Sequence, residues 1–369
     1  MRVLILNWRD IKNPFSGGAE ILTHELSKRL ILKGHSVTIF SSYFQGAKKE
    51  EIIDGVKIIR DGNPDARTLF NSVQLKAYLR YKKEFQGKID LVVDEVHGIP
   101  FCTPFYVKEK KIALICEVAG DLWDIAVSFP FNILGKFVER IYPFFYSKIK
   151  LLTISETSKE ELAQIGFDQS KIYVIPMGSN SKIVEDFPEK EKNETLVFLS
   201  RLSKSKGIED AIKCLSLIKN DFPNVVLWVI GRGEEIFKKE LIKLIKKLDI
   251  ENNVIFFDYV TEEKKEDLLT RAHILIIPSI KEGWGLTVHE AGARATPAIV
   301  YDVPGLREVV KNNVNGIICK RNSAEELASN AKKLLKDKAL YEKLQKGAIN
   351  ERKKRSWDET VNQFLDFVK

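Results

Sequence analysis

The sequence predicts an α/β fold of two Rossmann-like, doubly wound domains that face a central cleft. Three observations lead to this expectation. Short apolar runs alternate with amphipathic helical stretches along the chain, the runs are rich in Val, Ile and Leu, and one polar stretch interrupts the rhythm near the middle. Such runs are typical of parallel strands that helices cover on both faces. A chain of 369 residues has room for two domains of this kind.

Each half of the chain supplies its own set of expected strands. In the first half they lie near Val3–Asn7, Ser36–Ser41, Val56–Ile59, Ile89–Val93, Ile112–Cys116, Leu151–Ile154 and Tyr173–Ile175. In the second half they lie near Leu196–Ser200, Val225–Ile230, Val254–Phe257, Ile274–Ile277, Ala298–Tyr301 and Gly316–Cys319. A helix over Ala19–Lys33, closed by Gly34, is expected between the first two strands.

The expected domain boundaries follow from the polar stretch GSNSKIVEDFPEKEKNE, residues 178–194. Its apolar residues do not recur at helix or strand spacing, so it is interpreted as a linker. We therefore expect an N-terminal domain at 1–180, a linker at 181–194 and a C-terminal domain at 195–355. Residues 356–369 predict a helix that crosses back to the first domain. Ligands of such sheets gather at the carboxyl ends of the strands and at domain interfaces, so functional residues are sought in loops that follow strands.

Composition and charge narrow the class of protein. No apolar run approaches the length of a membrane span, and the start of the chain does not have the pattern of a signal peptide. The four cysteines, Cys102, Cys116, Cys214 and Cys319, lack metal-site or disulfide spacing. We expect a cytoplasmic protein with reduced thiols. The formal charge of +8 favours phosphates, nucleotides or the inner face of the cell membrane as partners, and equally fits a solvated surface; no nucleic-acid partner is expected.

The stretch KEGWGLTVHEAG, residues 281–292, is the first candidate site. It follows an expected strand, passes through Gly-Trp-Gly and enters an expected helix near Leu286 and Thr287. Free N–H groups at a helix start bind anions, and glycines let a phosphate approach the backbone. Glu282 and Glu290 offer only acceptors, which suits the hydroxyls of a sugar or ribose. The alternative is that these glutamates are a surface residue and a helix-dipole stabiliser.

The stretch FLSRLSKSKGIEDAI, residues 198–212, is the second candidate site. Arg201 and Lys206 lie in the loop between the first strand and helix of the second domain. Two such cations can neutralise a diphosphate without a metal ion. The chain contains no Asp-x-Asp pair, so we expect no metal and no other cofactor. A solvated basic loop is the alternative.

A third candidate, NWRDIKNPFSGGAE, residues 7–20, places Gly17 and Gly18 between the first strand and the first helix. Backbone N–H groups there can also approach a phosphate. Glycines alone are a weak signal, and the glycine pair Gly231 and Gly233 in VIGRGEE is weaker still.

These stretches, with VIPMGSN, AHILIIPSIKEGWGLTVHEAGARATP and VPGLREVV, make the chain resemble the retaining glycosyltransferases of family 4, which have the GT-B fold. The resemblance spans nearly the whole chain. It implies a nucleotide-sugar donor held mainly by the second domain, with Arg201 and Lys206 on the diphosphate. The resemblance further implies that Glu282 contacts the donor sugar and Glu290 the ribose. Gly18, beside Gly17, would contact the phosphates. Phosphates and sugar would also meet the backbone of Gly283, Trp284, Gly285, Leu286 and Thr287.

The sequence departs from this family at three places. Ala295 stands where the family usually has glycine, and Asp258 where it often has glycine. After the linker proline, the common Asn-Gly-Ile-Asp is replaced by residues 177–180, Met-Gly-Ser-Asn. None of these changes removes a proposed charged contact.

His97, in the stretch DEVHGIP, follows an expected strand of the first domain. Many members of the family place a histidine after this strand, close to the transferred sugar. We expect His97 to hydrogen-bond a sugar hydroxyl or to support developing positive charge, and the neighbouring Asp94 and Glu95 to orient the acceptor hydroxyl. The alternative is a loop histidine without a catalytic task.

Residues 123–150 mix aromatic side chains with Lys136, Arg140, Lys148 and Lys150. Such a segment fits an anionic membrane surface that delivers a lipid-linked acceptor, and it fits an aromatic helical core equally well.

The resulting hypothesis is a metal-independent, retaining hexosyltransferase. A nucleotide sugar, with a UDP-sugar favoured over GDP-mannose, would donate its hexose to a hydroxyl of a lipid-linked or growing glycan. Charge stabilisation by Arg201, Lys206 and the helix start would drive departure of the diphosphate. The alternatives are a nucleotide-sugar epimerase of the same fold and a non-catalytic nucleotide-sugar binding protein; glycoside hydrolysis by a carboxylate pair is less favoured.

Overall fold

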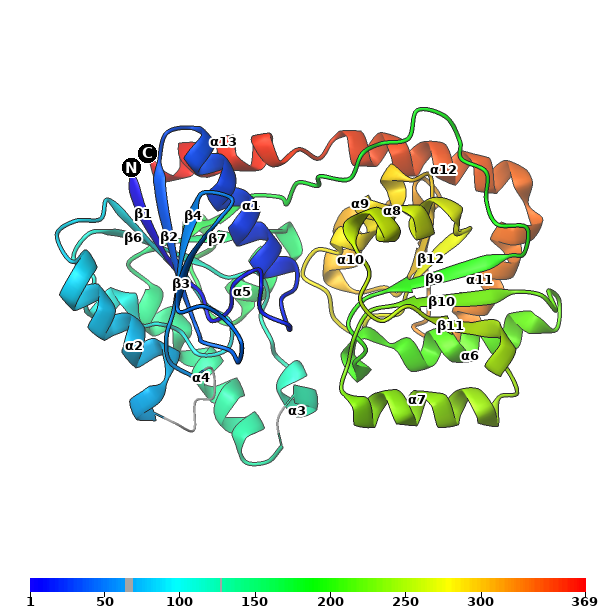
Figure 1. Ribbon diagram of the computed structural model, residues 1–369, viewed down its shortest axis with the longest axis horizontal. Helices are drawn as coiled ribbons and strands as arrows, with labels where there is room; N and C mark the ends of the chain where they lie inside the picture. The colour runs from blue at the N-terminus through cyan, green and yellow to red at the C-terminus, as the bar shows by residue number, and fades with distance from the viewer. Residues whose placement is uncertain (64–68, 127) are drawn as a thin grey trace. The chain divides into compact units, whose positions relative to one another are not determined.

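The computed structural model in Figure 1 describes residues 1–63, 69–126 and 128–369. The chain divides into two compact units. Unit 1 comprises Met1–Gly178 and Trp357–Lys369, and unit 2 comprises Ser179–Ser356. Each unit is a mostly parallel sheet with helices in the connections between its strands, which confirms the predicted α/β class with two doubly wound domains.

The sheet of unit 1 has eight strands in the order β3-β4-β2-β1-β5-β6-β7-β8. All neighbours are parallel except β3 and β4. The elements are β1 (Arg2–Leu6), α1 (Gly18–Leu32), β2 (Ser36–Ser41), β3 (Glu50–Ile53), β4 (Val56–Arg60), α2 (Val73–Arg80), β5 (Leu91–Glu95), β6 (Lys110–Leu114), α3 (Leu122–Ala126), α4 (Phe131–Tyr146), β7 (Lys150–Thr153), α5 (Glu156–Gln164), β8 (Ile172–Val174) and α13 (Trp357–Val368).

Two elements of unit 1 differ from the sequence-based expectation. Strand β3 was not predicted; it pairs with β4 through a tight turn in which Asp54 and Gly55 have positive φ, the backbone that an Asp-Gly hairpin turn requires. Strand β5 lies about two residues later than predicted, because Asp94 and Glu95 still pair with β6. Both carboxylates are therefore strand residues with buried side chains.

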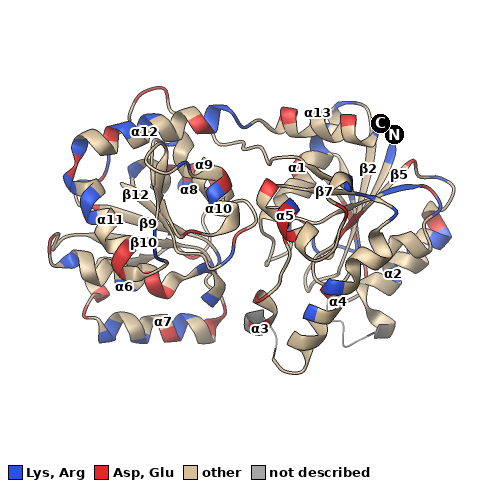
Figure 2. Cartoon of the chain, turned by 180° about the vertical axis from the view of Figure 1, so that it is seen from behind, with Lys and Arg blue, Asp and Glu red and all other residues tan. Residues whose placement is uncertain are grey.

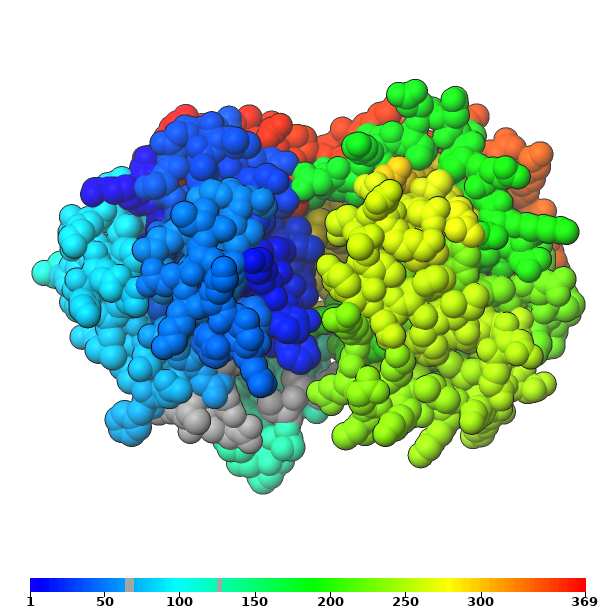
Figure 3. Space-filling view, viewed as in Figure 1, coloured from blue at the N-terminus to red at the C-terminus, as the bar shows by residue number. Residues whose placement is uncertain are grey.

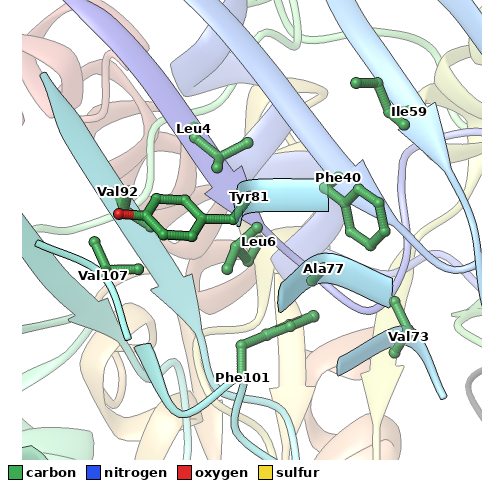
Figure 4. Packing of buried hydrophobic residues seen from close by; sticks show 10 residues of the cluster. All are labelled: Leu4, Leu6, Phe40, Ile59, Val73, Ala77, Tyr81, Val92, Phe101 and Val107. Carbon is green, nitrogen blue, oxygen red and sulfur yellow. The ribbon is translucent and has the colours of Figure 1, made fainter. Parts of the chain in front are cut away.

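The core of unit 1 forms where β1, β2, β4 and β5 meet α2 (Figure 4). Its cluster consists of Leu4, Leu6, Phe40, Ile59, Val73, Ala77, Tyr81, Val92, Phe101 and Val107. Burial of this apolar surface is the main favourable term in folding. Tyr81 keeps its polar end satisfied, because its hydroxyl pairs with Glu109 and accepts from the backbone N–H of Lys108 at 3.2 Å.

Helix α13 at the C-terminus belongs to unit 1, as does the N-terminus (Figure 1). Its residues Trp357, Val361 and Phe364 are buried. The Thr360 hydroxyl donates to the Pro176 carbonyl at 2.8 Å, and the Phe367 ring lies 4.6 Å from that of Tyr173. The helix is thus packed into the unit along its length.

The sheet of unit 2 has six parallel strands in the order β11-β10-β9-β12-β13-β14. The elements are β9 (Thr195–Leu199), α6 (Ile208–Lys219), β10 (Val226–Ile230), α7 (Glu235–Lys247), β11 (Val254–Phe256), α8 (Glu262–Arg271), β12 (Ile274–Ile277), α9 (Leu286–Ala293), β13 (Ala298–Val300), α10 (Pro304–Val309), β14 (Gly316–Ile318), α11 (Ala324–Lys336) and α12 (Lys338–Lys353). All six strands were predicted.

The polar stretch before β9 lies on the surface of unit 2, where Figures 1 and 3 show it in green. Val184 donates its backbone N–H to Ala293 at 2.9 Å, and Glu191 donates to Arg271 at 2.9 Å. The Lys190 ammonium donates to the carbonyls of Thr270 and Arg294 and to a hydroxyl, so it caps the ends of α8 and α9. These contacts fix the segment on the unit.

Within residues 1–63, 69–126 and 128–369, no helix is both long and apolar enough to cross a bilayer.

Candidate functional site

Both sheets reverse their winding direction at one point. In unit 2 the chain builds β9, β10 and β11 toward one edge and then returns to place β12 on the other side of β9. In unit 1 the same reversal falls between β1 and β5. At such a switch point two neighbouring loops leave the carboxyl ends of the strands in opposite directions, and ligands bind there. The candidate residues of each unit lie in these loops or in the helices that follow them.

In unit 2 the loop after β9 and the loop after β12 are joined through their backbones. The Ile280 N–H donates to the Ser205 carbonyl at 2.9 Å. Gly207 has φ of +70°, and a Cβ added there would lie 1.9 Å from the Pro278 carbonyl oxygen. Only glycine permits this close approach. The two predicted stretches of unit 2 therefore adjoin and form one candidate site.

Lys206 and Glu282 meet across this junction. The Lys206 ammonium lies 2.7 Å from a Glu282 carboxylate oxygen, and both side chains are largely buried. The Glu282 backbone is fixed from the other side, because its carbonyl accepts the Gly305 N–H at 3.0 Å. A Cβ at Gly305 would lie 2.0 Å from that carbonyl oxygen. Gly305 belongs to the stretch VPGLREVV, and the sequence alone does not predict its close approach to Glu282.

Helix α9 begins at Leu286, as predicted, and its start has no side-chain cap. Gly285 precedes it in the left-handed conformation, with φ of +83°, and the first turn contains no acidic residue. A Cβ at Gly285 would lie 2.8 Å from a methyl carbon of Leu306. The first N–H groups of the helix therefore receive no side-chain acceptor from the residue before it, the arrangement that suits an anion.

Trp284, expected among the donor-binding residues, is part of the packing beneath this helix. Its side chain is 3% exposed, the Arg355 guanidinium lies 5.1 Å from its ring centroid, and its ring lies 6.0 Å from that of His289. Its contribution to ligand binding is thus limited to its backbone. The side chain anchors the Gly-Trp-Gly bend.

Arg201 and Glu290 complete the set in unit 2. The Arg201 side chain is exposed in the loop after β9. One Glu290 carboxylate oxygen pairs with the Lys265 ammonium of α8 at 2.8 Å, with both side chains largely buried. Burial acts to lower the pKa of Lys265, but the carboxylates of Glu290 and Glu262 raise the pKa above its usual value. Sequence reasoning missed Lys265, because it stands in a run of charged residues typical of a solvated helix face.

In unit 1 the loop after β1 leads to Gly17, Gly18 and the start of α1. Here the helix start is capped by its own first turn, because the Gly17 N–H donates to the Glu20 carboxylate at 2.6 Å. The amide of Gly17 already has an acceptor, so Gly18 is the more available of the two predicted glycines.

His97 follows β5 and lies beside a group of buried carboxylates. Its Nε2 is 3.5 Å from a carboxylate oxygen of Glu95, which also accepts hydrogen bonds from the side chains of Asn7 and Thr23. Burial raises the pKa of Glu95. Burial acts to lower the pKa of His97, but the charge of Glu95, reinforced by that of Glu20, raises the pKa above its usual value.

Asp94 does not have the expected role of orienting an acceptor hydroxyl. Its side chain is fully buried, and its carboxylate accepts the Tyr146 hydroxyl at 2.6 Å and the Thr103 hydroxyl at 2.8 Å. The backbone N–H groups of Phe101 and Thr103 donate to it as well. Asp94 fixes the loop after β5. Glu95 is also buried, and its contacts hold β1, α1 and His97 together.

Within the described residues, 1–63, 69–126 and 128–369, no three His, Cys, Asp or Glu side chains gather in a way that could hold a metal ion.

Comparison with known proteins identifies the class and then the family. Among solved structures, the chain resembles sucrose-phosphate synthase from Thermosynechococcus elongatus, with a TM-score of 0.83, 17% identity and coverage of 99% of this chain and 98% of that one. It also resembles HepE of Anabaena in complex with UDP-glucose, with a TM-score of 0.78, 17% identity and coverage of 100% and 99%. The fold is that of the GT-B glycosyltransferases.

Two family models match consecutive parts of the chain. The model of Glycosyltransferase Family 4 matches residues 16–182, and that of Glycosyl transferases group 1 matches residues 179–351. The chain is a glycosyltransferase of this group 1, family 4 type. An uncharacterized glycosyltransferase of Methanocaldococcus jannaschii is 24% identical to it, over 99% of this chain and 98% of the relative.

Proposed function

We propose that this glycosyltransferase transfers a hexose from a UDP-sugar to a hydroxyl of a lipid-linked or growing glycan, with retention of the anomeric configuration and without a metal ion. The observation that carries the proposal is the junction of the two loops of unit 2. It brings Lys206 and Glu282 into contact beside the uncapped start of α9, with Arg201 in the same loop as Lys206.

The diphosphate is the first ligand group to place. Arg201 offers a planar fork of donors, Lys206 a compact charge, and the amides of Leu286 and Thr287 the positive end of a helix. An ammonium has three donors, so Lys206 can hold a phosphate oxygen while it keeps its bond to Glu282. Three kinds of donor on one diphosphate supply the charge that a divalent ion provides in other sites.

The hydroxyl groups of the donor are the second set of ligand groups to place. The carboxylates of Glu282 and Glu290 each accept from a lysine, and an ionised carboxylate has about four lone-pair sites. Each glutamate therefore retains acceptors for hydroxyl groups. We assign Glu282 to the donor sugar and Glu290 to the ribose. The roles proposed for Gly18 and His97 in unit 1 rest on the family resemblance alone.

The reaction breaks the bond between the anomeric carbon and the diphosphate. Negative charge grows on the leaving phosphate oxygen, positive charge on the sugar ring, and preorganised donors lower the barrier by stabilising the former. The acceptor oxygen forms the new bond on the face that the diphosphate leaves, and its proton passes to the departing phosphate oxygen. No carboxylate acts as a nucleophile in this scheme.

The choice of UDP is supported by HepE, a protein of similar fold whose structure contains UDP-glucose. Purified protein is to be incubated separately with UDP-glucose, UDP-N-acetylglucosamine and GDP-mannose, each with and without glycan acceptors. Release of nucleoside diphosphate and glycosylated acceptor are measured, with and without a chelator. We expect acceptor-dependent release from a UDP-sugar that a chelator does not reduce. An isomerised donor without dependence on acceptor would indicate an epimerase instead.

A matched pair of variants tests the charge stabilisation. Arg201→Ala is expected to lower kcat about 100- to 1000-fold, by analogy with removal of an oxyanion-hole donor. Lys204→Ala removes an exposed cation three residues away in the same loop and is expected to leave kcat unchanged. Equal activity of wild type and Arg201→Ala would contradict the proposed role.

A further inference from the structure

Helix α4 of unit 1 has its apolar residues on the outside. Leu134 is 54% exposed, Phe137 is 59% exposed and Phe144 is 81% exposed. These positions, three and seven residues apart, share one face of the helix. On the opposite side Glu139 and Tyr146 are buried. A surface helix normally shows the reverse distribution, so this exposed face requires an explanation.

The contacts of the buried face prevent the helix from turning its apolar face inward. Glu139 accepts the backbone N–H groups of Ala119 at 2.6 Å and Gly120 at 2.8 Å. The Tyr146 hydroxyl donates to the buried Asp94. The Trp123 ring packs so closely on Gly135 that an added Cβ would lie 2.4 Å from it. The outward apolar face is therefore fixed by the fold.

The exposed apolar surface continues beyond this stripe. Phe131 and Ile133 are 48% and 57% exposed at the start of the helix. Near its end the Phe145 ring links Phe144, at 5.5 Å, with Phe105, at 5.2 Å, and Phe105 is itself 66% exposed. We define the α4 patch as Phe105, Phe131, Ile133, Leu134, Phe137 and Phe144.

Positive charge accompanies the α4 patch. Over residues 131–150 the one carboxylate is Glu139, which is buried, whereas the segment contains Lys136, Arg140, Lys148 and Lys150. Arg140 is exposed on the face of Phe137 and Phe144, and Lys148 is exposed just past the helix end. Figure 2 shows the helix in tan with basic positions along it. The other two cations are engaged: Lys136 by Asp121 and Asp124, and the exposed Lys150 by the rings of Tyr173 and Phe367.

We propose that the α4 patch docks on an anionic lipid bilayer, with its aromatic and aliphatic side chains in the interfacial layer and Arg140 and Lys148 on the lipid headgroups. Aromatic and aliphatic side chains flanked by cations are the composition that interfacial helices use. A second copy of the chain fits less well, because it would bring the same cations against Arg140 and Lys148. This surface lies outside the donor residues and does not depend on the identity of the sugar.

The test is sedimentation of the full chain with vesicles of phosphatidylcholine alone and of phosphatidylcholine mixed with phosphatidylglycerol. Wild type is expected to bind the mixed vesicles, and more weakly as salt is added. Phe137→Ser/Phe144→Ser should reduce the partition coefficient roughly a hundredfold. Arg140→Gln/Lys148→Gln should reduce it about 25-fold on mixed vesicles, since each cation near the surface contributes about fivefold, and leave binding to phosphatidylcholine unchanged.

The matched control is Ile52→Ser/Phe70→Ser, which removes two apolar side chains that are 74% and 88% exposed elsewhere in unit 1. This variant should bind like wild type. Thermal unfolding of every variant establishes that it is folded, and nucleoside diphosphate release in the absence of vesicles separates loss of docking from loss of turnover. Absence of vesicle binding by wild type, or equal losses in the control and the α4 variants, would overturn the proposal. A wild-type dimer that becomes monomeric in Phe137→Ser/Phe144→Ser would assign the patch to a second copy instead.

Discussion

The two glycine-containing loops at the switch points have opposite electrostatic environments. In unit 1 the start of α1 is capped by Glu20 from its own first turn, and Glu95 lies buried at the end of the adjacent strand. In unit 2 the start of α9 has no side-chain cap and no acidic residue in its first turn, and the adjoining loop supplies Lys206. A glycine-rich strand-to-helix turn does not by itself make an anion site; the charge and capping of its surroundings decide.

The pKa values of the two histidines near these loops also differ. Burial acts against the charged form of both. Beside Glu95, the pKa of His97 is nevertheless raised. Burial, with the positive charges of Arg355 and Arg352, lowers the pKa of His289 to about 3. For His289 burial is the larger cause and the two arginines add to it, whereas for His97 the neighbouring carboxylates outweigh burial and favour a protonated imidazole.

The largest difference between the two units is expected when one methyl group is added at each helix start. Gly285→Ala is expected to lower the free energy of unfolding by about 2 kcal/mol, because φ is positive and the new Cβ meets Leu306. Donor turnover should fall about a hundredfold as the start of α9 moves. In Gly17→Ala the backbone is extended and the Cβ meets its nearest neighbour at 3.7 Å, so only the weaker preference for alanine at an N-cap acts, and the loss should be below about 1 kcal/mol. Urea unfolding measures the stability of the two variants, and nucleoside diphosphate release measures their turnover. Similar losses of stability in both variants would contradict the proposed difference between the two helix starts.

The buried His289 of unit 2 should make the free energy of unfolding depend on pH. Between pH 6.5 and about 3 the unfolded chain protonates this histidine and the folded chain does not, so the stability present above pH 6.5 is lost as the pH falls. The contribution between pH 7 and pH 5 is about 2 kcal/mol. His289→Leu should therefore flatten the profile of unfolding free energy in this window. Parallel profiles for wild type and His289→Leu would refute a buried neutral histidine.

Substitutions just after the C-terminal ends of the same two helices should change the free energy of unfolding by a smaller amount. Helix α1 ends before Gly34 with φ of +83°, and α9 ends before Ala295 with φ of +53°. Alanine is strained in this conformation, so Ala295→Gly should raise the free energy of unfolding by about 1 kcal/mol. Gly34→Ala should lower it by a similar amount, because an added Cβ there has no neighbour within 4 Å among the described residues and only the backbone changes. Thermal unfolding of both variants checks the symmetry; a destabilised Ala295→Gly would show that packing outweighs backbone strain.

The smallest change in the free energy of unfolding is expected from Glu20→Gln. Loss of the charge at the start of α1 should lower the free energy of unfolding by about 0.5 kcal/mol while the amide still caps Gly17. If unit 2 dominates diphosphate binding, the affinity for UDP should not decrease, since a carboxylate near Gly18 can only repel a phosphate. Isothermal titration with UDP provides the measurement. Weaker UDP binding by Glu20→Gln would mean that this carboxylate supports the donor site.

Sequence reasoning recovered most of the fold because buried parallel strands are continuous apolar runs. All strands of unit 2 and all parallel strands of unit 1 were predicted. Strand β3 was not predicted because EEII is too polar for a buried strand, although the Asp-Gly that follows it is typical of a hairpin turn.

The residues of the candidate site could be proposed from the sequence, but their pairings could not. Arg201, Lys206, Glu282 and Glu290 fall in the loops and helix where strand-end reasoning places ligand contacts. Their partners could not be foreseen, since Lys265 reaches Glu290 from another helix and Gly305 meets Glu282 through its backbone alone. The cap on Gly17 depended on a local rule that was not applied, because glutamate three residues after the helix start is a capping signal.

The proposed diphosphate site is the junction of the two loops in unit 2, with two cations and an uncapped helix start. Its direct test is a crystal structure of the protein with UDP. Phosphate oxygens are expected within hydrogen-bond distance of Arg201, Lys206 and the backbone N–H groups of the first turn of α9. Phosphates bound instead at the start of α1, or away from both cations, would contradict it.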